Sequence, residues 1–256
     1  MRTLGIAFAS LLVTSTVGQA ATKQFVQNGG FEIVNPAATN ASGNFEFGAN
    51  YAPNSGPNVV PGWISPTTPA YNLIFNPVNA FTPAGNAKGT FDYTGNEYLN
   101  GGASGKASPN GGKFAALDGD PKYSGPIQQQ INGLIAGDKY KLTFDWAAAQ
   151  VASRKGPTTD YIVAMLGSSV YNTTTFDLPS AGFSGWMTAS TTFVATGTSE
   201  LLSFLDKGTP AGLPPIALLD GVTLTGPSNT AVPEPAAIAI LGLGLAGLGA
   251  ARLRRR

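Results

Sequence analysis

The stretch KYKLTFDW, from Lys139 to Trp146, decides the fold because its residues alternate strictly between polar and apolar. One face carries four large apolar side chains, namely Tyr140, Leu142, Phe144 and Trp146. Successive side chains of a β-strand point to opposite faces, so this pattern predicts a strand with one buried face. We therefore expect Phe144 to lie in the protein core.

Short segments of similar character surround this stretch, each bounded by Gly, Pro, Asn or Asp. They cover residues 113–117, 127–131, 160–166, 186–194, 200–205 and 216–224. The chain between them shows no sustained helical period, so the sequence predicts an all-β fold, an antiparallel β-sandwich of jelly-roll type. The Asn-, Gly- and Pro-rich region 36–112 is expected to form long loops with two or three short strands.

The composition excludes several kinds of chemistry. The chain has 256 residues, of which 11% are charged, and it contains no His and no Cys. Catalytic sites that need a Ser-His or Cys-His pair, thiolate or imidazole metal sites, and disulfide bonds are therefore all excluded. The low charge and the 33 Gly and 19 Pro are typical of an exported, turn-rich β-protein.

The N-terminus predicts export. Arg2 precedes an apolar run from Leu4 to Val13, and Gly18 and Ala20 supply the small residues of a cleavage site. We interpret residues 1–21 as a secretory signal peptide, the alternative being a short core helix. The β-sandwich domain is then expected to cover residues 22–229.

The C-terminus has three parts: Val232-Pro233-Glu234-Pro235, an uncharged run over residues 236–251, and a final cluster of arginines. Sixteen residues make a helix of about 24 Å, slightly shorter than the ~30 Å hydrocarbon core of a bilayer. We predict a sorting tail over residues 230–256, with a single hydrophobic helix in the inner membrane. The arginines are expected on the cytoplasmic side.

Removing both ends changes the charge balance. Five of the 15 basic residues and one of the 14 acidic residues lie in these ends, which leaves the predicted domain with a net charge of about −3. The arginines are thus a topology signal, and the domain has no basic patch. We expect no nucleic-acid partner.

The tail resembles the PEP-CTERM sorting signals of exported bacterial proteins. The resemblance implies an exosortase-type membrane protease as partner, which would recognise Val232, Pro233, Glu234 and Pro235 and the helix after them. It further implies a Gram-negative bacterium and a final location at the cell surface or in an extracellular polysaccharide matrix, such as a biofilm.

The domain resembles the galactose-binding-like β-sandwiches, which include carbohydrate-binding modules and choice-of-anchor surface domains. The matching segments follow the same order along the chain: Asn28–Glu32, Pro61–Trp63, Ile131–Leu134, Gly185-Trp186 and Leu219–Leu224. Gly221 departs from the pattern, because those domains often have Asn or Asp at this place. The resemblance implies a binding or structural role.

Asp220 is the most informative acidic residue. Period-2 alternation predicts that it shares a buried face with Leu218, Val222 and Leu224. A buried carboxylate needs a partner, either a cation such as Ca²⁺ or backbone amides and a Lys. The resemblance implies a structural Ca²⁺ between Glu32 and Asp220. A second calcium candidate is the turn at Asp118 and Asp120, for which an ordinary Asp-Gly turn is the alternative.

Three aromatic residues are candidate ligand-binding side chains: Trp63, Trp186 and Tyr93. Each could offer a ring face to a sugar, but for the two tryptophans core packing is favoured, because large aromatic side chains usually lie in cores. Tyr98 and Tyr123 are further candidates.

The sequence therefore favours an exported, surface-sorted, non-enzymatic β-sandwich associated with extracellular polysaccharide. Two alternatives remain open at this point. One is a secreted carbohydrate-active enzyme that uses paired carboxylates, and the other is a structural adhesin without a sugar pocket.

Overall fold

The computed structural model describes residues 22–34, 60–66, 70–75, 99–100, 107–151, 154–213 and 215–228. The predicted signal peptide, the sorting tail and most of region 36–112, Tyr93 and Tyr98 included, lie outside the described residues. Within those ranges, no helix is long and apolar enough to cross a membrane. The described residues form strands and turns, with no helix among them.

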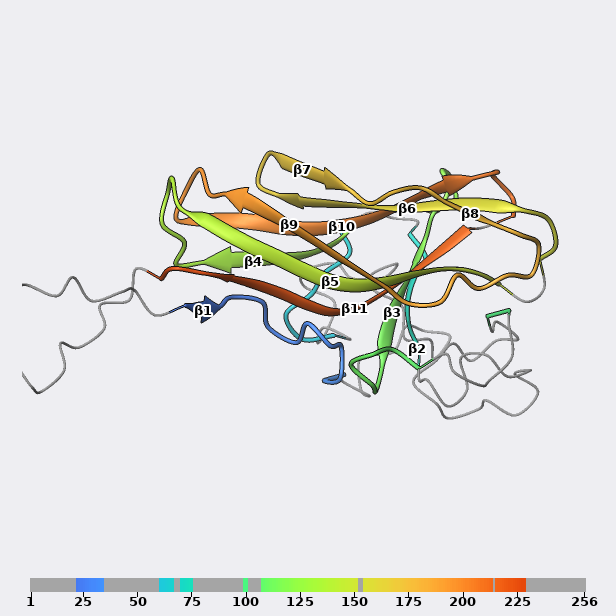
Figure 1. Ribbon diagram of the computed structural model, residues 1–256, viewed down its shortest axis with the longest axis horizontal. Coiled ribbons are helices and arrows are strands. Elements are labelled where there is room, and N and C mark those ends of the chain that lie inside the picture. Colours follow the sequence, from blue (N-terminus) through green and yellow to red (C-terminus); the bar gives the residue numbers. More distant parts are fainter. Residues whose placement is uncertain are drawn as a thin grey trace, which may run out of the picture. The chain divides into compact units, whose positions relative to one another are not determined.

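The strands form two antiparallel sheets (Figure 1). The first sheet has the order β2 (Asn72–Phe75), β3 (Phe114–Asp118), β11 (Pro215–Gly226), β5 (Lys139–Gln150) and β9 (Met187–Val194), and β1 (Lys23–Gln24) pairs with β11. The second has the order β4 (Ile127–Asn132), β10 (Ser199–Thr209), β6 (Thr158–Leu166) and β7 (Ser169–Asn172), and β8 (Phe176–Leu178) pairs with β6. This confirms the predicted all-β sandwich.

The main core lies between the two sheets and takes side chains from both. The predicted apolar face of β5 is buried there, from Tyr140 to Trp146. Phe144 is fully buried and meets Phe204 of β10 edge to face, with ring centroids 5.1 Å apart. The seven strands expected from the sequence are present, with shifted ends.

A second apolar cluster covers the other face of one end of the first sheet. Its buried members are Phe75, Leu99, Phe114, Ala116, Ala147, Ala149, Ile216 and Leu218. Because this end is buried on both faces, β3 is buried at every position and the alternation of β5 stops after Trp146. That explains why the sequence pattern did not predict the extension of β5 to Gln150.

The sequence prediction for β11 was wrong in one respect. The register with β5 shifts between Asp220 and Thr223, which marks a β-bulge. An inserted residue reverses the alternation, so Leu218 lies in the second cluster whereas Val222 and Leu224 lie in the main core. Asp220 therefore does not share a face with Val222 and Leu224.

Candidate functional site: a carboxylate pair and a tyrosine platform

Glu32 and Asp220 come together although 188 positions separate them in the chain. The Glu32 Cγ and the Asp220 Oδ1 both lie within 4 Å of the point where a Cβ on Gly30 would stand, at 3.9 and 3.8 Å. Asp220 is fully buried, whereas 52% of the Glu32 side chain is exposed. The structure thus places one buried and one accessible carboxylate beside the same glycine.

The partners of the two carboxylates differ. The Asp220 Oδ1 accepts a hydrogen bond from the Gly221 N–H at 2.7 Å, and its Oδ2 has no hydrogen-bond partner. The Glu32 Oε1 accepts one from the Lys113 N–H at 2.7 Å, and the Lys113 ammonium lies 3.8 Å from the Glu32 Oε2. One buried oxygen, on a carboxylate that the Ser108 hydroxyl also approaches, is therefore left for a further ligand.

Burial, together with the negative charges of Glu32 and Asp145, raises the pKa of Asp220 to about 7. The Ser108 hydroxyl and the Gly221 N–H oppose this shift. A positive charge placed here would stabilise the ionised form of Asp220.

Asp145 lies opposite Asp220 across the β5–β11 pair. It accepts hydrogen bonds from the Asn110 amide at 2.7 Å and from the Thr188 hydroxyl at 2.6 Å. The Asn110 side chain occupies the place of a Cβ on Gly221, and Gly221 has a positive φ of 58°. This packing and this backbone conformation explain why the chain has glycine at Gly221.

The residues present fit a hard cation in part. Calcium prefers carboxylate and carbonyl oxygens, and Asp220 offers a buried oxygen that lacks a partner. Glu32 and Asp220 would hold the ion, which would neutralise their charges and tie the N-terminal segment to β11. The described part of the chain contains no group of three or more acidic side chains arranged for a metal.

The Asp118–Asp120 turn is held by its own backbone. The Asp118 Oδ1 accepts a hydrogen bond from the Asp120 N–H at 2.7 Å. The two oxygens of Asp120 accept from the Lys122 N–H at 2.9 Å and from the Gly212 N–H at 2.6 Å. These contacts favour the alternative of an ordinary turn over a calcium site.

Trp63 is a core residue. It is fully buried, it packs against Phe31 and Phe204, and its indole N–H donates to the Asn28 carbonyl at 3.1 Å. A buried indole has no face to offer, so the assignment of Trp63 to ligand binding is corrected in favour of core packing. Trp186 is half-buried and packs edge to face on Phe114, at a centroid distance of 5.4 Å.

A second aromatic pair lies elsewhere, formed by the exposed Tyr71 and the half-buried Tyr123. Their ring centroids are 4.8 Å apart with an interplanar angle of 35°. Tyr71 is 40% exposed, and the Lys122 ammonium lies 5.1 Å from the centre of the Tyr123 ring. We call Tyr71, Lys122 and Tyr123 the tyrosine platform.

The two tyrosines are joined through the backbone, because the Tyr71 N–H donates to the Tyr123 carbonyl at 3.1 Å. The contact with Tyr123 raises the pKa of Lys122, so the ammonium stays charged. Tyr123 was among the sequence candidates, whereas Tyr71 was not. In the sequence, Tyr71 is only a tyrosine just before a short strand. Its pairing with Tyr123 depends on the Asp120–Ser124 turn, which the sequence does not place beside it.

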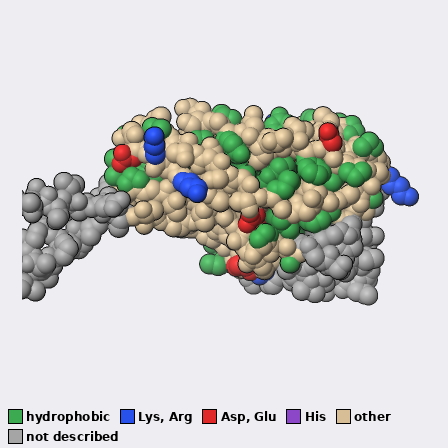
Figure 2. Space-filling model, viewed as in Figure 1, with side chains coloured by type: hydrophobic (Ala, Val, Ile, Leu, Met, Phe, Trp, Pro, Cys, Tyr) green, Lys and Arg blue, Asp and Glu red, His purple; other side chains and the backbone are tan. Residues whose placement is uncertain are grey.

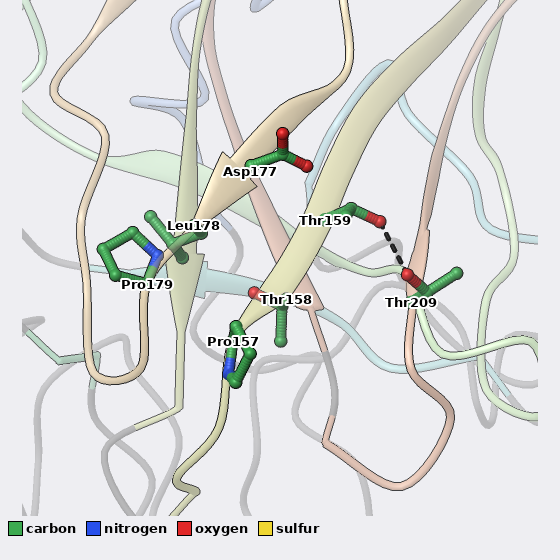
Figure 3. Close-up of a pocket in the computed structure, with 7 residues that line it drawn as sticks. All are labelled: Pro157, Thr158, Thr159, Asp177, Leu178, Pro179 and Thr209. Atoms are coloured by element: carbon green, nitrogen blue, oxygen red, sulfur yellow. Dashed lines mark hydrogen bonds between the residues drawn. The ribbon is translucent and has the colours of Figure 1, made fainter.

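A cleft of about 500 Å³ opens where β6 and β8 pair (Figure 3). It is lined by Pro157, Thr158, Thr159, Asp177, Leu178, Pro179 and Thr209. The hydroxyls of Thr159 and Thr209 are hydrogen-bonded at 2.8 Å, as the dashed line in Figure 3 shows. The lining lacks an aromatic ring, so this cleft offers no stacking surface for a sugar.

Charged side chains are few and scattered on the face shown in Figure 2. Lys and Arg do not gather there into a patch.

The C-terminal segment matches a known family of sorting motifs. Residues 231–256 match the PEP-CTERM protein-sorting motif. The chain thus ends in a PEP-CTERM sorting tail. This match confirms the predicted sorting motif, and such a tail indicates export and surface sorting in Gram-negative bacteria. No curated protein matches the chain.

Several solved structures are similar to the PEP-CTERM protein at low identity. A cyclase from Fischerella sp. TAU is 16% identical with a TM-score of 0.45, over 82% of this chain and all of the other. A structure described as CBM4 is 18% identical with a TM-score of 0.31, over 78% and 97%. TmCBM61 in complex with β-1,4-galactotriose is 12% identical with a TM-score of 0.32, over 60% and 86%.

Proposed function

We propose that this PEP-CTERM protein is a non-enzymatic, surface-sorted β-sandwich that binds extracellular polysaccharide through the tyrosine platform. The observation that carries the proposal is the exposed ring of Tyr71 packed on the half-buried ring of Tyr123. Aromatic rings are usually buried in a sandwich, and an exposed ring in a pair with a cation beside it suits the apolar face and hydroxyl groups of a sugar.

The roles within the platform follow from its geometry. Lys122 lies against the Tyr123 ring, so a sugar would stack on Tyr71, the more exposed ring. The Lys122 ammonium would donate hydrogen bonds to sugar hydroxyls or pair with the carboxylates of an acidic polysaccharide. An extended glycan is a more suitable ligand than a free monosaccharide, because the platform is an open surface.

A binding role is favoured over glycoside hydrolysis. Hydrolysis needs two carboxyl groups about 5 to 9.5 Å apart on either side of an accessible sugar. Asp160 and Asp206 are neighbouring carboxylates, and both are fully buried, so they could not reach a polysaccharide in the folded protein. In the other pair, Glu32 is accessible but Asp220 is fully buried.

In this protein, calcium at Glu32 and Asp220 would act as a structural ion. The buried Asp220 Oδ2 without a partner supports it. The cation would fix the N-terminal segment, and no chemistry on the ligand is assigned to it.

A glycan-array experiment with the exported protein tests the binding role, paired with an assay for released reducing ends. We expect binding without release of sugar. Tyr71→Ala should weaken binding at least about tenfold, as expected for the loss of an aromatic anchor. Tyr161→Ala is the control, because Tyr161 is a half-buried tyrosine on β6 of the other sheet. Equal binding by the two variants would contradict the platform, and turnover would favour an enzyme.

A second experiment tests sorting. Deletion of residues 232–256 should leave the protein freely secreted in a host that has the sorting protease. The full chain should appear first in the membrane fraction and then at the surface. Identical fractionation of the two forms would show that the tail has no sorting role.

A further inference from the structure

Two buried aspartates outside the sites above occupy neighbouring positions in the second sheet. In the register of β6 and β10, Asp160 is opposite Gly208 and Asp206 is opposite Ile162. Residues two apart on a strand share a face, so Asp160 and Asp206 are diagonal neighbours on the same face. Ile162 belongs to the main core, so this face is the inner one. Both aspartates are fully buried.

Their oxygens have few partners. The Asp206 Oδ2 accepts a hydrogen bond from the Ala217 N–H of β11 at 2.8 Å, which links the second sheet to the first. The Asp206 Oδ1 and both oxygens of Asp160 lack a hydrogen-bond partner. The Thr158 hydroxyl, on the same face of β6, interacts with the Asp160 carboxylate and opposes the rise of its pKa. These few contacts leave buried carboxylate oxygens without a full set of partners at one place.

The charged groups around the pair do not neutralise it. From the end of β3, Asp118 adds a third acidic group whose own pKa burial raises to about 7, and Arg154 acts on Asp118. Lys207 on β10 contributes its backbone N–H to Asp206. From β8, Asp177 is paired with Thr159 and is exposed. In the described ranges, no ion pair joins a basic side chain to Asp160 or Asp206.

Two ionised carboxylates cannot be buried side by side without compensation, because each loses its hydration and repels the other. A basic side chain, a metal ion or a proton can compensate. The described residues supply no such ion pair, and both carboxylates are fully buried, so neither is open to an ion from solvent. The remaining form of compensation is a proton held between the two carboxyl groups, which needs no further ligand.

We propose that Asp160 and Asp206 share a proton, and that this proton makes the contact between the two sheets sensitive to pH. With the proton present, one carboxyl group donates to the other, and Asp206 keeps its hydrogen bond to Ala217. When the proton leaves, two buried negative charges face each other next to Asp118, and the contact with β11 weakens.

The direction of the pH effect follows from the protonation of the two states. Burial raises the pKa of Asp160 to about 8, and burial together with the charge of Asp160 raises that of Asp206 well above 3.8. Between about pH 4 and pH 8 the folded state therefore binds more protons than the unfolded state. Stability is highest at the acidic end of this range and falls as the pH rises towards 8.

Urea denaturation of the full chain from pH 5 to pH 8 tests the proposal, in an Asp220→Asn background with chelator present. The unfolding constant should rise by about tenfold per pH unit for each proton that only the folded state holds. Replacing both residues, Asp160→Asn together with Asp206→Asn, should remove about tenfold per pH unit from this rise, because neither amide can ionise. Asp177→Asn, an exposed control on β8, should leave the rise unchanged. An unchanged rise in the double variant would overturn the proposal.

A second measurement covers the case in which the double variant does not fold. The infrared spectrum of the same Asp220→Asn chain at pH 7 should contain the carbonyl band of a protonated carboxylic acid, and the band should vanish above pH 9. Absence of the band at pH 7 would overturn the proposal. Stabilisation of this chain by added calcium at pH 8 would also overturn it, because a cation would then occupy the pair.

Discussion

Asp220 and the Asp160–Asp206 pair are both buried acidic regions, yet they differ in what can reach them. Asp220 lies beside Glu32, whose side chain is 52% exposed, and both carboxylates lie next to the small Gly30. Asp160 and Asp206 lie on the inner face of the second sheet and are fully buried. Solvent borders the first region, whereas protein encloses the second.

This difference bears on how each region is neutralised. A metal ion needs several oxygen ligands and access from solvent. The exposed Glu32 side chain is accessible from solvent. A proton needs neither such ligands nor such access. We therefore propose a cation at Glu32 and Asp220 and a proton at Asp160 and Asp206, so that calcium acts on the first region alone, whereas pH acts on both.

Phe144→Ala should have the largest effect, because it would weaken both regions together. Phe144 precedes Asp145, which lies opposite Asp220, and it contacts Phe204 on the strand that carries Asp206. Truncation of a buried aromatic side chain costs about 3–5 kcal/mol of unfolding free energy. Urea denaturation measures it, with exposed Lys141→Ala as the control on the same strand. An unchanged midpoint would show that Phe144 is not in the core.

Calcium should act on the Asp220 region alone. At a free concentration a hundredfold above Kd, an ion that binds only the folded state adds about 2.7 kcal/mol of stability. The pKa of Asp220 is about 7 without the ion, so unliganded stability falls as the pH rises through 7, and the gain from calcium is larger at pH 8 than at pH 5.

Melting temperatures with calcium and with chelator measure this effect. Asp220→Asn should abolish the difference between them, because it removes one ligand charge at nearly constant shape. If chelator affects neither protein while Asp220→Asn still destabilises the fold, then Asp220 is held by hydrogen bonds alone. A wild-type melting curve that is indifferent to calcium would remove the ion from the proposal.

A pair of glycine substitutions compares the packing of the two regions and should have the smallest effect. A Cβ on Gly119 would lie 2.7 Å from the Asp206 Oδ2, and Asp206 is held by Ala217. Gly119→Ala should therefore cost about 1–3 kcal/mol. A Cβ on Gly30 would meet nothing closer than 3.8 Å, so Gly30→Ala should change stability by less than about 0.5 kcal/mol. Equal effects in chelator, measured by denaturation, would contradict the difference in packing.

The sequence by itself determined the fold class and the sorting tail. Strict alternation over Lys139–Trp146 is a local property of the chain, and every apolar residue of that face is buried. The sorting motif is contiguous as well, so its residues could be recognised without a structure. Asp220 could also be identified as buried, since it lies within an apolar strand.

Tertiary structure decided which residues meet. The bulge after Asp220 reverses the face of β11, and the second cluster buries the end of β5 on both sides, which no local period could indicate. Tyr71 and Tyr123 are brought together by the Asp120–Ser124 turn, and Asp160 and Asp206 by the β6–β10 register. Contacts between residues far apart in the chain depend on strand order and register, and these are set by the packing of the whole sandwich rather than by any single segment.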